Sequence, residues 1–170
     1  MVNALLKSGK KTIGAGAGNP PVIVDDTADI KKAAREISRG AAFDNNLLCL
    51  AEKEVFVMES VADELIRNMC GEGARLITEE ETARLLEVVF KKKNGVYSVD
   101  KKWVGKDAGI ILESIGIHDM ECRLIICQVP HDHPFVLVEQ LMPVLPVVRC
   151  KTFEECVQYA VIAENGNRHT

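Results

Sequence analysis

The sequence lacks a long apolar run, an excess of basic residues and a regular spacing of its six cysteines. No apolar run approaches the roughly 20 residues that cross a bilayer, and residues 1–6 are too short for the apolar core of a signal peptide. A net charge of −4 and a pI near 5.6 argue against nucleic acid or an anionic membrane as a partner. Irregular cysteine spacing favours reduced thiols. We therefore expect a cytoplasmic protein with neither a nucleic-acid nor a membrane partner.

The chain has 170 residues, of which 47% are hydrophobic, so it can bury the core of one full domain. Apolar runs rich in Val, Ile and Leu alternate with helical patterns. The expected strands are 21–25, 54–58, 75–77, 123–129 and 144–150, and the expected helices are 28–43, 60–70, 79–91, 107–115 and 152–164. Such alternation predicts an α/β fold of three layers, in which helices cover a largely parallel, twisted sheet. The run Lys91 to Lys93 is expected to be the solvated end of a helix.

Cys49 has the setting most typical of a reactive thiol. Thr27 and Asp29 supply cap residues at the start of the helix 28–43, and the asparagines at 45 and 46 accept the left-handed backbone angles of a sharp turn. Cys49 ends this loop, just before the strand 54–58. The alternative is a buried cysteine that packs as a small hydrophobe. No lysine, arginine or histidine is adjacent to Cys49 within the loop, so the source of any thiolate stabilisation is not evident.

The glycines between Gly14 and Gly18 could belong to a phosphate-binding loop, but they precede a strand instead of following one. The more favoured interpretation is close backbone packing beside the reactive loop.

Cys122, Cys127, His131 and His133 carry the ligand types of a zinc site. The two cysteines are separated by an odd number of positions across an expected strand, so they should point to opposite faces. We expect no metal.

Glu139 is a further candidate site residue. It is an acid among apolar residues and prolines, in the stretch 138–146. A carboxylate placed there either finds a functional partner or lies on the surface at the entry of a strand.

Three segments together resemble the aldehyde dehydrogenase family, and in particular the CoA-acylating propionaldehyde and acetaldehyde dehydrogenases of bacterial propanediol- and ethanolamine-utilisation microcompartments. They are 14–25 (GAGAGNPPVIVD), 43–53 (FDNNLLCLAEK) and 139–149 (EQLMPVLPVVR). The resemblance implies that residues 10–170 are a C-terminally truncated catalytic domain. Residues 1–9 would then be the last-helix remnant of a missing NAD-binding domain. It also implies a homo-oligomer when full length, located in the cytoplasm or within a microcompartment.

The resemblance also assigns roles to the candidate residues. Cys49 stands at the position of the family's nucleophile, and Glu139 at that of an acid that contacts the nicotinamide ribose. Cys49 would attack a short-chain aldehyde, pass hydride to NAD, and transfer the resulting acyl group to CoA, with its own backbone N–H donating to the oxyanion. Neither NAD nor CoA is expected to bind fully to this fragment, which should lack turnover by itself.

Departures from the wider family fit acyl transfer to a thiol. Gly14 stands where hydrolytic members carry a water-activating glutamate. Asn46 and Leu47 replace a common Gly-Gln pair, and Leu141 replaces a phenylalanine. Two other classes remain as alternatives, namely a non-catalytic interaction module of a microcompartment and an NAD-independent thioester hydrolase.

Overall fold

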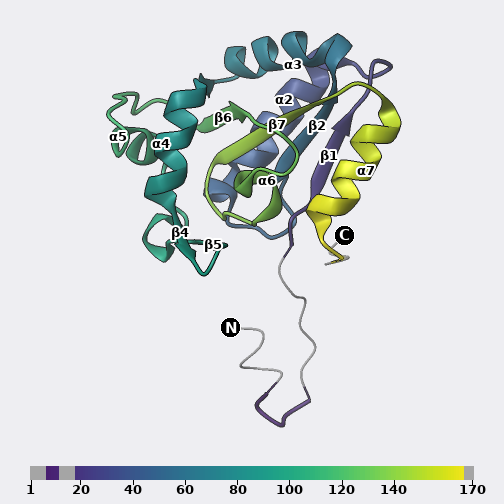
Figure 1. The fold of residues 1–170 in the computed structure, drawn as a ribbon. Coiled ribbons are helices and arrows are strands. Elements are labelled where there is room, and N and C mark those ends of the chain that lie inside the picture. The colour runs from purple at the N-terminus through teal and green to yellow at the C-terminus, as the bar shows by residue number, and fades with distance from the viewer. Residues whose placement is uncertain (1–6, 12–17, 167–170) are drawn as a thin grey trace.

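The computed structural model describes residues 7–11 and 18–166, and its centre is a five-stranded sheet (Figure 1). All neighbouring strands pair in parallel. The strand order is β1 (Pro21–Val24), β2 (Glu54–Met58), β7 (Val144–Cys150), β6 (Leu124–Gln128) and β3 (Ala74–Ile77). Strands β2, β6 and β7 are buried almost throughout, as expected of near-continuous Val/Ile/Leu runs covered on both faces. The prediction of a largely parallel sheet is confirmed.

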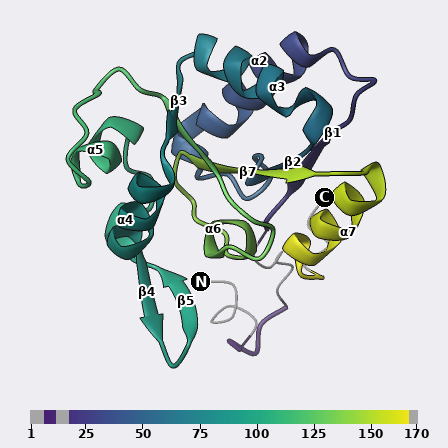
Figure 2. The same ribbon diagram turned by 45° about the horizontal axis from the view of Figure 1, so that its top comes forward.

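Helices cover both faces of this sheet, which gives three layers (Figures 1 and 2). One face carries α2 (Ile30–Ala42) and α3 (Glu59–Gly71), and the other carries α4 (Glu79–Val89), α5 (Ala108–Glu113), α6 (Pro134–Leu137) and α7 (Phe153–Glu164). The alternation of β2 follows this division. Val55 and Val57 pack beneath α2 and α3, whereas Phe56 packs beneath α7. The predicted three-layer α/β fold is therefore confirmed.

The helix starts follow local capping chemistry. Asp29 caps α2 by accepting the backbone N–H of Lys32 at 3.0 Å, as the sequence predicted. Thr78 and Glu81 form a reciprocal capping box at the start of α4, and Thr152 caps α7. Each cap satisfies backbone donors that the first helical turn leaves unpaired. The ten expected helices and strands match the observed ones to within two residues at every boundary.

The prediction was wrong for the residues that follow α4. The helix stops at Val89, and Phe90–Lys93 forms strand β4, which pairs antiparallel with β5 (Val96–Val99). The turn residues Asn94 and Gly95 both have positive φ, of 52° and 81°, as a two-residue hairpin turn requires. The run Lys91 to Lys93 is thus an exposed strand, not a helix end. Figure 2 shows the hairpin projecting from the body of the domain.

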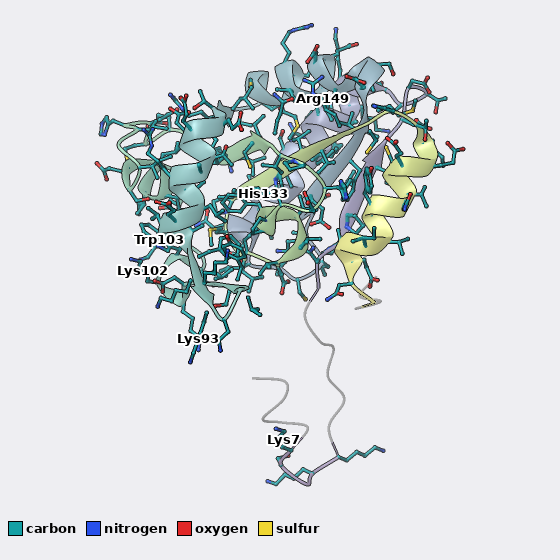
Figure 3. All side chains as sticks on the ribbon, viewed as in Figure 1. Lys7, Lys93, Lys102, Trp103, His133 and Arg149 are labelled. Carbon is teal, nitrogen blue, oxygen red and sulfur yellow. The ribbon has the colours of Figure 1, made fainter. Side chains whose placement is uncertain are left out.

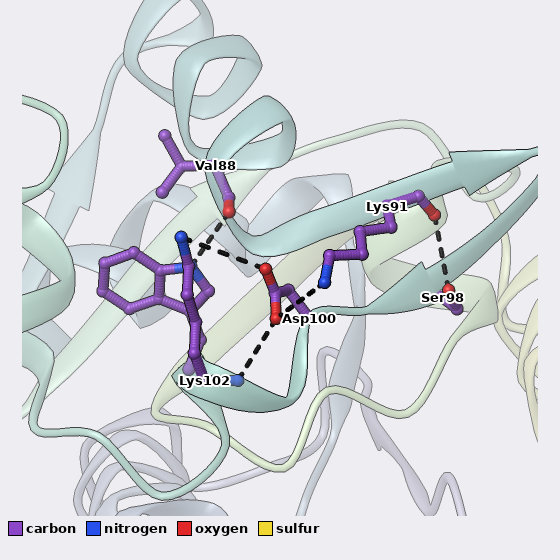
Figure 4. A network of polar contacts seen from close by, with 6 residues as sticks. Val88, Lys91, Ser98, Asp100 and Lys102 are labelled. Atoms are coloured by element: carbon purple, nitrogen blue, oxygen red, sulfur yellow. Dashed lines mark hydrogen bonds and ion pairs between the residues drawn. The ribbon is translucent and has the colours of Figure 1, made fainter.

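A small polar network joins the base of this hairpin to α4 (Figure 4). The short helix η2 (Lys101–Trp103) follows β5, and the Trp103 indole N–H donates to the carbonyl of Val88 at 2.9 Å. Asp100 accepts the backbone N–H of Lys102 at 3.3 Å and forms an ion pair with Lys91 at 3.2 Å. These contacts are local and lie at the surface.

Other short elements were not predicted, namely η1 (Phe43–Asn46), η2 and α6. Their length explains this, because three or four residues carry no visible periodicity. Most of the predicted remnant helix at 1–9 and the glycines at 14–17 lie outside the described residues.

Candidate functional site

The segments before β1, β2 and β7 meet at one edge of the sheet. Gly18 precedes β1, Cys49 precedes β2 and Glu139 precedes β7. These strands are neighbours and run in parallel, so their amino ends share an edge. A Cβ built on Gly18 would lie 3.4 Å from Glu139 Oε1 and would collide with the carbonyl oxygen of Cys49. The fold therefore brings Cys49 and Glu139 together, although 90 positions separate them.

The close approach at Gly18 confirms, for this residue, the interpretation of the glycines as packing residues beside the reactive loop. Only a glycine leaves room for the Cys49 backbone there. Gly14, which stands at the position of the hydrolytic base, lies outside the described residues.

The loop before Cys49 turns through consecutive left-handed residues. Helix α2 ends at Ala42, and Asp44, Asn45 and Asn46 then have φ values of 48°, 51° and 60°. Asparagine and aspartate tolerate this conformation better than other non-glycine residues. The turn predicted at the two asparagines is confirmed, and it reverses the chain after α2.

Cys49 is a free, half-buried thiol at the end of this turn. Within the described residues, its backbone N–H donates to no acceptor. Cys122, Cys127, Cys150 and Cys156 are buried, and Cys70 is exposed on α3. Cys49 thus combines an accessible thiol with a free backbone donor, which is what attack on a carbonyl carbon and stabilisation of its oxyanion need.

Hydrogen bonds tie the Cys49 loop to the Glu139 segment through residues 103–107. Asn45 Nδ2 donates to the carbonyl of Gly105 at 3.1 Å and to Asp107 Oδ1 at 2.7 Å. The Gly105 N–H donates to the carbonyl of Leu141 at 3.0 Å. Leu141 itself has a φ of 54°, which is rare for a branched side chain. The two candidate residues are therefore held by loops that brace each other.

A lysine lies buried beneath the loop, and the sequence did not reveal it. The side chain of Lys53 is only 1% exposed. Its Nζ donates to the backbone carbonyl of Asn46 at 2.7 Å and also to Asn46 Oδ1. Desolvation lowers the pKa of Lys53 to about 8, although the negative charges of Glu139 and Cys49 act in the opposite direction. Lysine is seldom buried, so no pattern in the sequence could have indicated this role.

Glu54 is a second buried ionisable group, next to Lys53 in sequence. It has no exposed surface, and neither of its carboxyl oxygens has a hydrogen-bond partner within the described residues. Desolvation raises the pKa of Glu54 to about 9, the charge of Lys53 lowers it and that of Glu139 raises it. Glu54 is therefore an uncharged acid at neutral pH. Glu139 Oε1 is also buried without a hydrogen-bond partner among these residues.

The cysteine and histidine side chains near β6 do not assemble into a metal site. Among the described residues, no group of three His, Cys, Asp or Glu side chains could hold a metal ion. His131 stacks on Tyr159 at 3.9 Å between ring centroids, and His133 Nδ1 accepts the backbone N–H of Phe135. The argument that Cys122 and Cys127 lie on opposite faces was wrong, because Cys122 precedes β6 and both thiols pack into one core cluster.

One cavity of the domain lies away from Cys49 and Glu139. It has a volume of about 880 Å³ and is lined by the end of β3, the start of α4 and the loop after β6. Its polar lining includes Thr78, His133 and Arg149, the last two labelled in Figure 3. Arg149 already pairs with Asp63, and His133 caps α6. The cavity is therefore not the place where the candidate nucleophile would act.

No helix in the part of the chain that the structure describes is long and apolar enough to cross a membrane.

A parallel α/β sheet with a half-buried thiol and a carboxylate at its amino edge suits a domain for thiol chemistry on a carbonyl. The chain belongs to the aldehyde dehydrogenase family, because the sequence model of the Aldehyde dehydrogenase family matches residues 2–168.

Relatives within this family act on short aldehydes. The acetaldehyde dehydrogenase (acetylating) EutE of Salmonella typhimurium is 46% identical over 164 residues, which are 95% of this chain and 35% of that protein. A propionaldehyde dehydrogenase from the Clostridium phytofermentans fucose utilisation bacterial microcompartment is 47% identical with a TM-score of 0.91, over 99% of this chain and 38% of that one. Rhodopseudomonas palustris propionaldehyde dehydrogenase, solved with bound CoA and an acylated cysteine, is 45% identical with a TM-score of 0.91. The match covers 99% of this chain and 38% of that one. This chain thus spans about a third of the length of the curated relatives it matches.

Proposed function

We propose that this chain is the catalytic domain of a CoA-acylating aldehyde dehydrogenase, which oxidises a short-chain aldehyde to acyl-CoA with NAD as hydride acceptor. The observation that carries the proposal is that the half-buried residue Cys49 and Glu139 both lie against Gly18, at the shared amino edge of β1, β2 and β7. The acylated cysteine of the similar Rhodopseudomonas palustris enzyme is a precedent for such a nucleophile.

Cys49 carries the covalent chemistry in this proposal. Its thiolate forms a bond to the aldehyde carbon, and its own backbone N–H donates to the oxyanion that develops. Loss of hydride from that carbon leaves an acyl thioester on Cys49, and the thiol of CoA then takes the acyl group and releases the cysteine. NAD, when bound, supplies the hydride acceptor.

Glu139 is the residue proposed to contact the nicotinamide ribose. Its Oε1 atom is buried and accepts no hydrogen bond from the described residues. A buried carboxylate oxygen without a donor is costly, and a ribose hydroxyl would supply the missing donor. The residue present therefore fits the group that the family requires.

The proposal includes the domain division 1–9 and 10–170, and the surface around Cys49 supports a further NAD-binding domain that completes the site. Phe43 is 62% exposed and Leu50 is 69% exposed, and Leu47 and Leu48 are also exposed. Clustered exposed apolar side chains on a loop mark a surface that another unit or a substrate covers. We also propose oligomerisation of the complete enzyme and, from its microcompartment relative, a location within a bacterial microcompartment.

The proposal is tested by acyl transfer to the thiol. The 170-residue chain is incubated with propionyl-CoA and, separately, with S-propionyl-N-acetylcysteamine, a small thioester that needs no CoA-binding surface. Intact mass and peptide mapping then locate the adduct. We expect a single acyl group on Cys49 that a Cys49→Ala variant lacks.

Two results would contradict the proposal. One is the absence of any adduct from either thioester while Cys49 still reacts with iodoacetamide. The other is release of free acid from propionyl-CoA without NAD, which would favour a thioester hydrolase. Sustained NADH formation by this chain alone would contradict only the idea that a further domain completes the site.

A further inference from the structure

Lys53 is an unusual residue to find beneath a nucleophile. Burying an ammonium group is costly unless hydrogen bonds and nearby negative charge compensate for the lost water. Both acceptors of its Nζ belong to Asn46, through the backbone carbonyl and the side-chain oxygen. The same Asn46 donates from Nδ2 to the carbonyls of Ala41 and Glu52, each at 2.9 Å. Lys53 therefore holds the apex of the turn that presents Cys49.

The positive charge of Lys53 is not neutralised by a direct ion pair within the described residues. Its hydrogen-bond acceptors are uncharged amide oxygens. The ionisable groups that face it are Glu139, Cys49, Glu54 and Glu52. Glu54 is uncharged at neutral pH, as argued above. Of these groups, Glu139 interacts most strongly with the ammonium group and Cys49 next.

The remaining acid, Glu52, is directed elsewhere. Its carboxylate lies against Gly40 of α2, where any Cβ would collide with it. Glu52 and Lys53 are consecutive residues in an extended segment that leads into β2, so their side chains point in different directions.

We propose that Lys53 is a positioning residue for the chemistry of Cys49, which holds the loop through Asn46 and supplies the buried positive charge that favours the Cys49 thiolate. This inference rests on the proposed function of Cys49 as a nucleophile. The sequence left open what would stabilise the Cys49 thiolate, because no basic residue lies next to Cys49 within the loop. Lys53, buried beneath the loop, is the proposed answer.

The test is the pH dependence of alkylation. The 170-residue chain, carrying Cys70→Ser to remove the exposed competing thiol, reacts with iodoacetamide between pH 5.5 and 10, and the Cys49 peptide is quantified by mass. A Lys53→Met variant should move the midpoint of the Cys49 profile upward by about one pH unit, so that alkylation at pH 7 is about tenfold slower.

Matched variants separate charge from shape. Lys53→Gln keeps a donor for the oxygens of Asn46 but has no charge, so it should move the midpoint as Lys53→Met does. It carries the test if Lys53→Met does not fold. Lys53→Arg keeps the charge and should keep the midpoint. Glu54→Gln changes an equally buried neighbour that is neutral at pH 7, and should leave the rate of Cys49 alkylation at pH 7 unchanged.

Unchanged midpoints in Lys53→Gln and Lys53→Met would overturn the inference, even if the limiting rate at high pH falls, because a fall in rate alone indicates a structural role. Failure of the proposed function has a different signature. In that case acyl transfer from the two thioesters is absent, while the alkylation profile still depends on the charge at position 53.

Discussion

Two lysine-centred polar networks occupy very different surroundings in this domain. At the base of the hairpin, Lys91 and Lys102 surround Asp100, and their side chains are 69% and 64% exposed (Figure 4). Beneath the Cys49 loop, Lys53 is 1% exposed and Glu54 has no exposed surface. Water screens the first network, so its ion pairs contribute little. In the second, burial shifts both pKa values, and the same residue types can influence chemistry.

The two acids show the contrast most clearly. The pKa of Glu54 is raised to about 9 by desolvation. Desolvation also acts to raise the pKa of Asp100, but a hydrogen bond from the Lys102 backbone and the charge of Lys91 outweigh it, so that this pKa is lowered. At neutral pH, the raised pKa of Glu54 therefore lowers the free energy of unfolding, whereas the lowered pKa of Asp100 raises it.

The largest expected effect is a gain in stability from Glu54→Gln. The folded-state pKa lies above the unfolded one, so the contribution of Glu54 is fully present below pH 4.5 and is lost as pH rises towards 9. Glutamine cannot ionise, so the variant should gain about 4 kcal/mol at pH 8 and almost nothing at pH 4.5. Urea unfolding followed by the fluorescence of Trp103, the single tryptophan, measures both values.

Asp100→Asn is the matched control for this experiment. The free energy of unfolding of this variant should be slightly lower at pH 8. A carboxyl group whose pKa is lowered in the folded state stabilises that state above the unfolded pKa, and this stabilisation is lost as pH falls. A gain from Glu54→Gln that is the same at both pH values would show that Glu54 is not a buried neutral acid.

The next effect compares two asparagines with left-handed backbones. Asn46 has a φ of 60°, donates one buried and one partly buried hydrogen bond, and accepts a hydrogen bond from Lys53. Asn94 has a φ of 52° and lies exposed at the hairpin tip. We expect Asn46→Ala to lower the free energy of unfolding by about 3 kcal/mol, and Asn94→Ala by about 1 kcal/mol, which is the backbone cost alone. If urea unfolding showed equal losses of free energy for the two variants, the hydrogen bonds of Asn46 would contribute nothing to stability.

The smallest effect concerns the surface network itself. Lys91→Met removes an ion pair that is exposed and screened. The urea midpoint of this variant should match that of the parent chain at 0.5 M salt and fall slightly below it at 10 mM salt. A large fall in the urea midpoint that persists at 0.5 M salt would contradict the contrast between the two networks, since the hairpin network would then behave as a buried one.

Local chemistry explains which parts of the fold were predictable. Buried Val/Ile/Leu runs and the cap at Asp29 lie in the sequence itself, and the structure confirms them. The hairpin was also predictable, because Asn94-Gly95 is a strong turn signal, but the run Lys91 to Lys93 before it was assigned to the end of a helix. The pairing of Cys49 with Glu139 came from resemblance, since no local pattern links residues so far apart.

The sequence by itself determined the layers of this domain and the turn at Asn45 and Asn46, because periodicity and backbone preference act over a few residues. Only the tertiary structure decided that the amino ends of β1, β2 and β7 meet, and that Lys53 lies buried under Asn46. Strand order and burial depend on the whole packed chain, and burial turns an ordinary lysine into a group that can act on a nearby thiol.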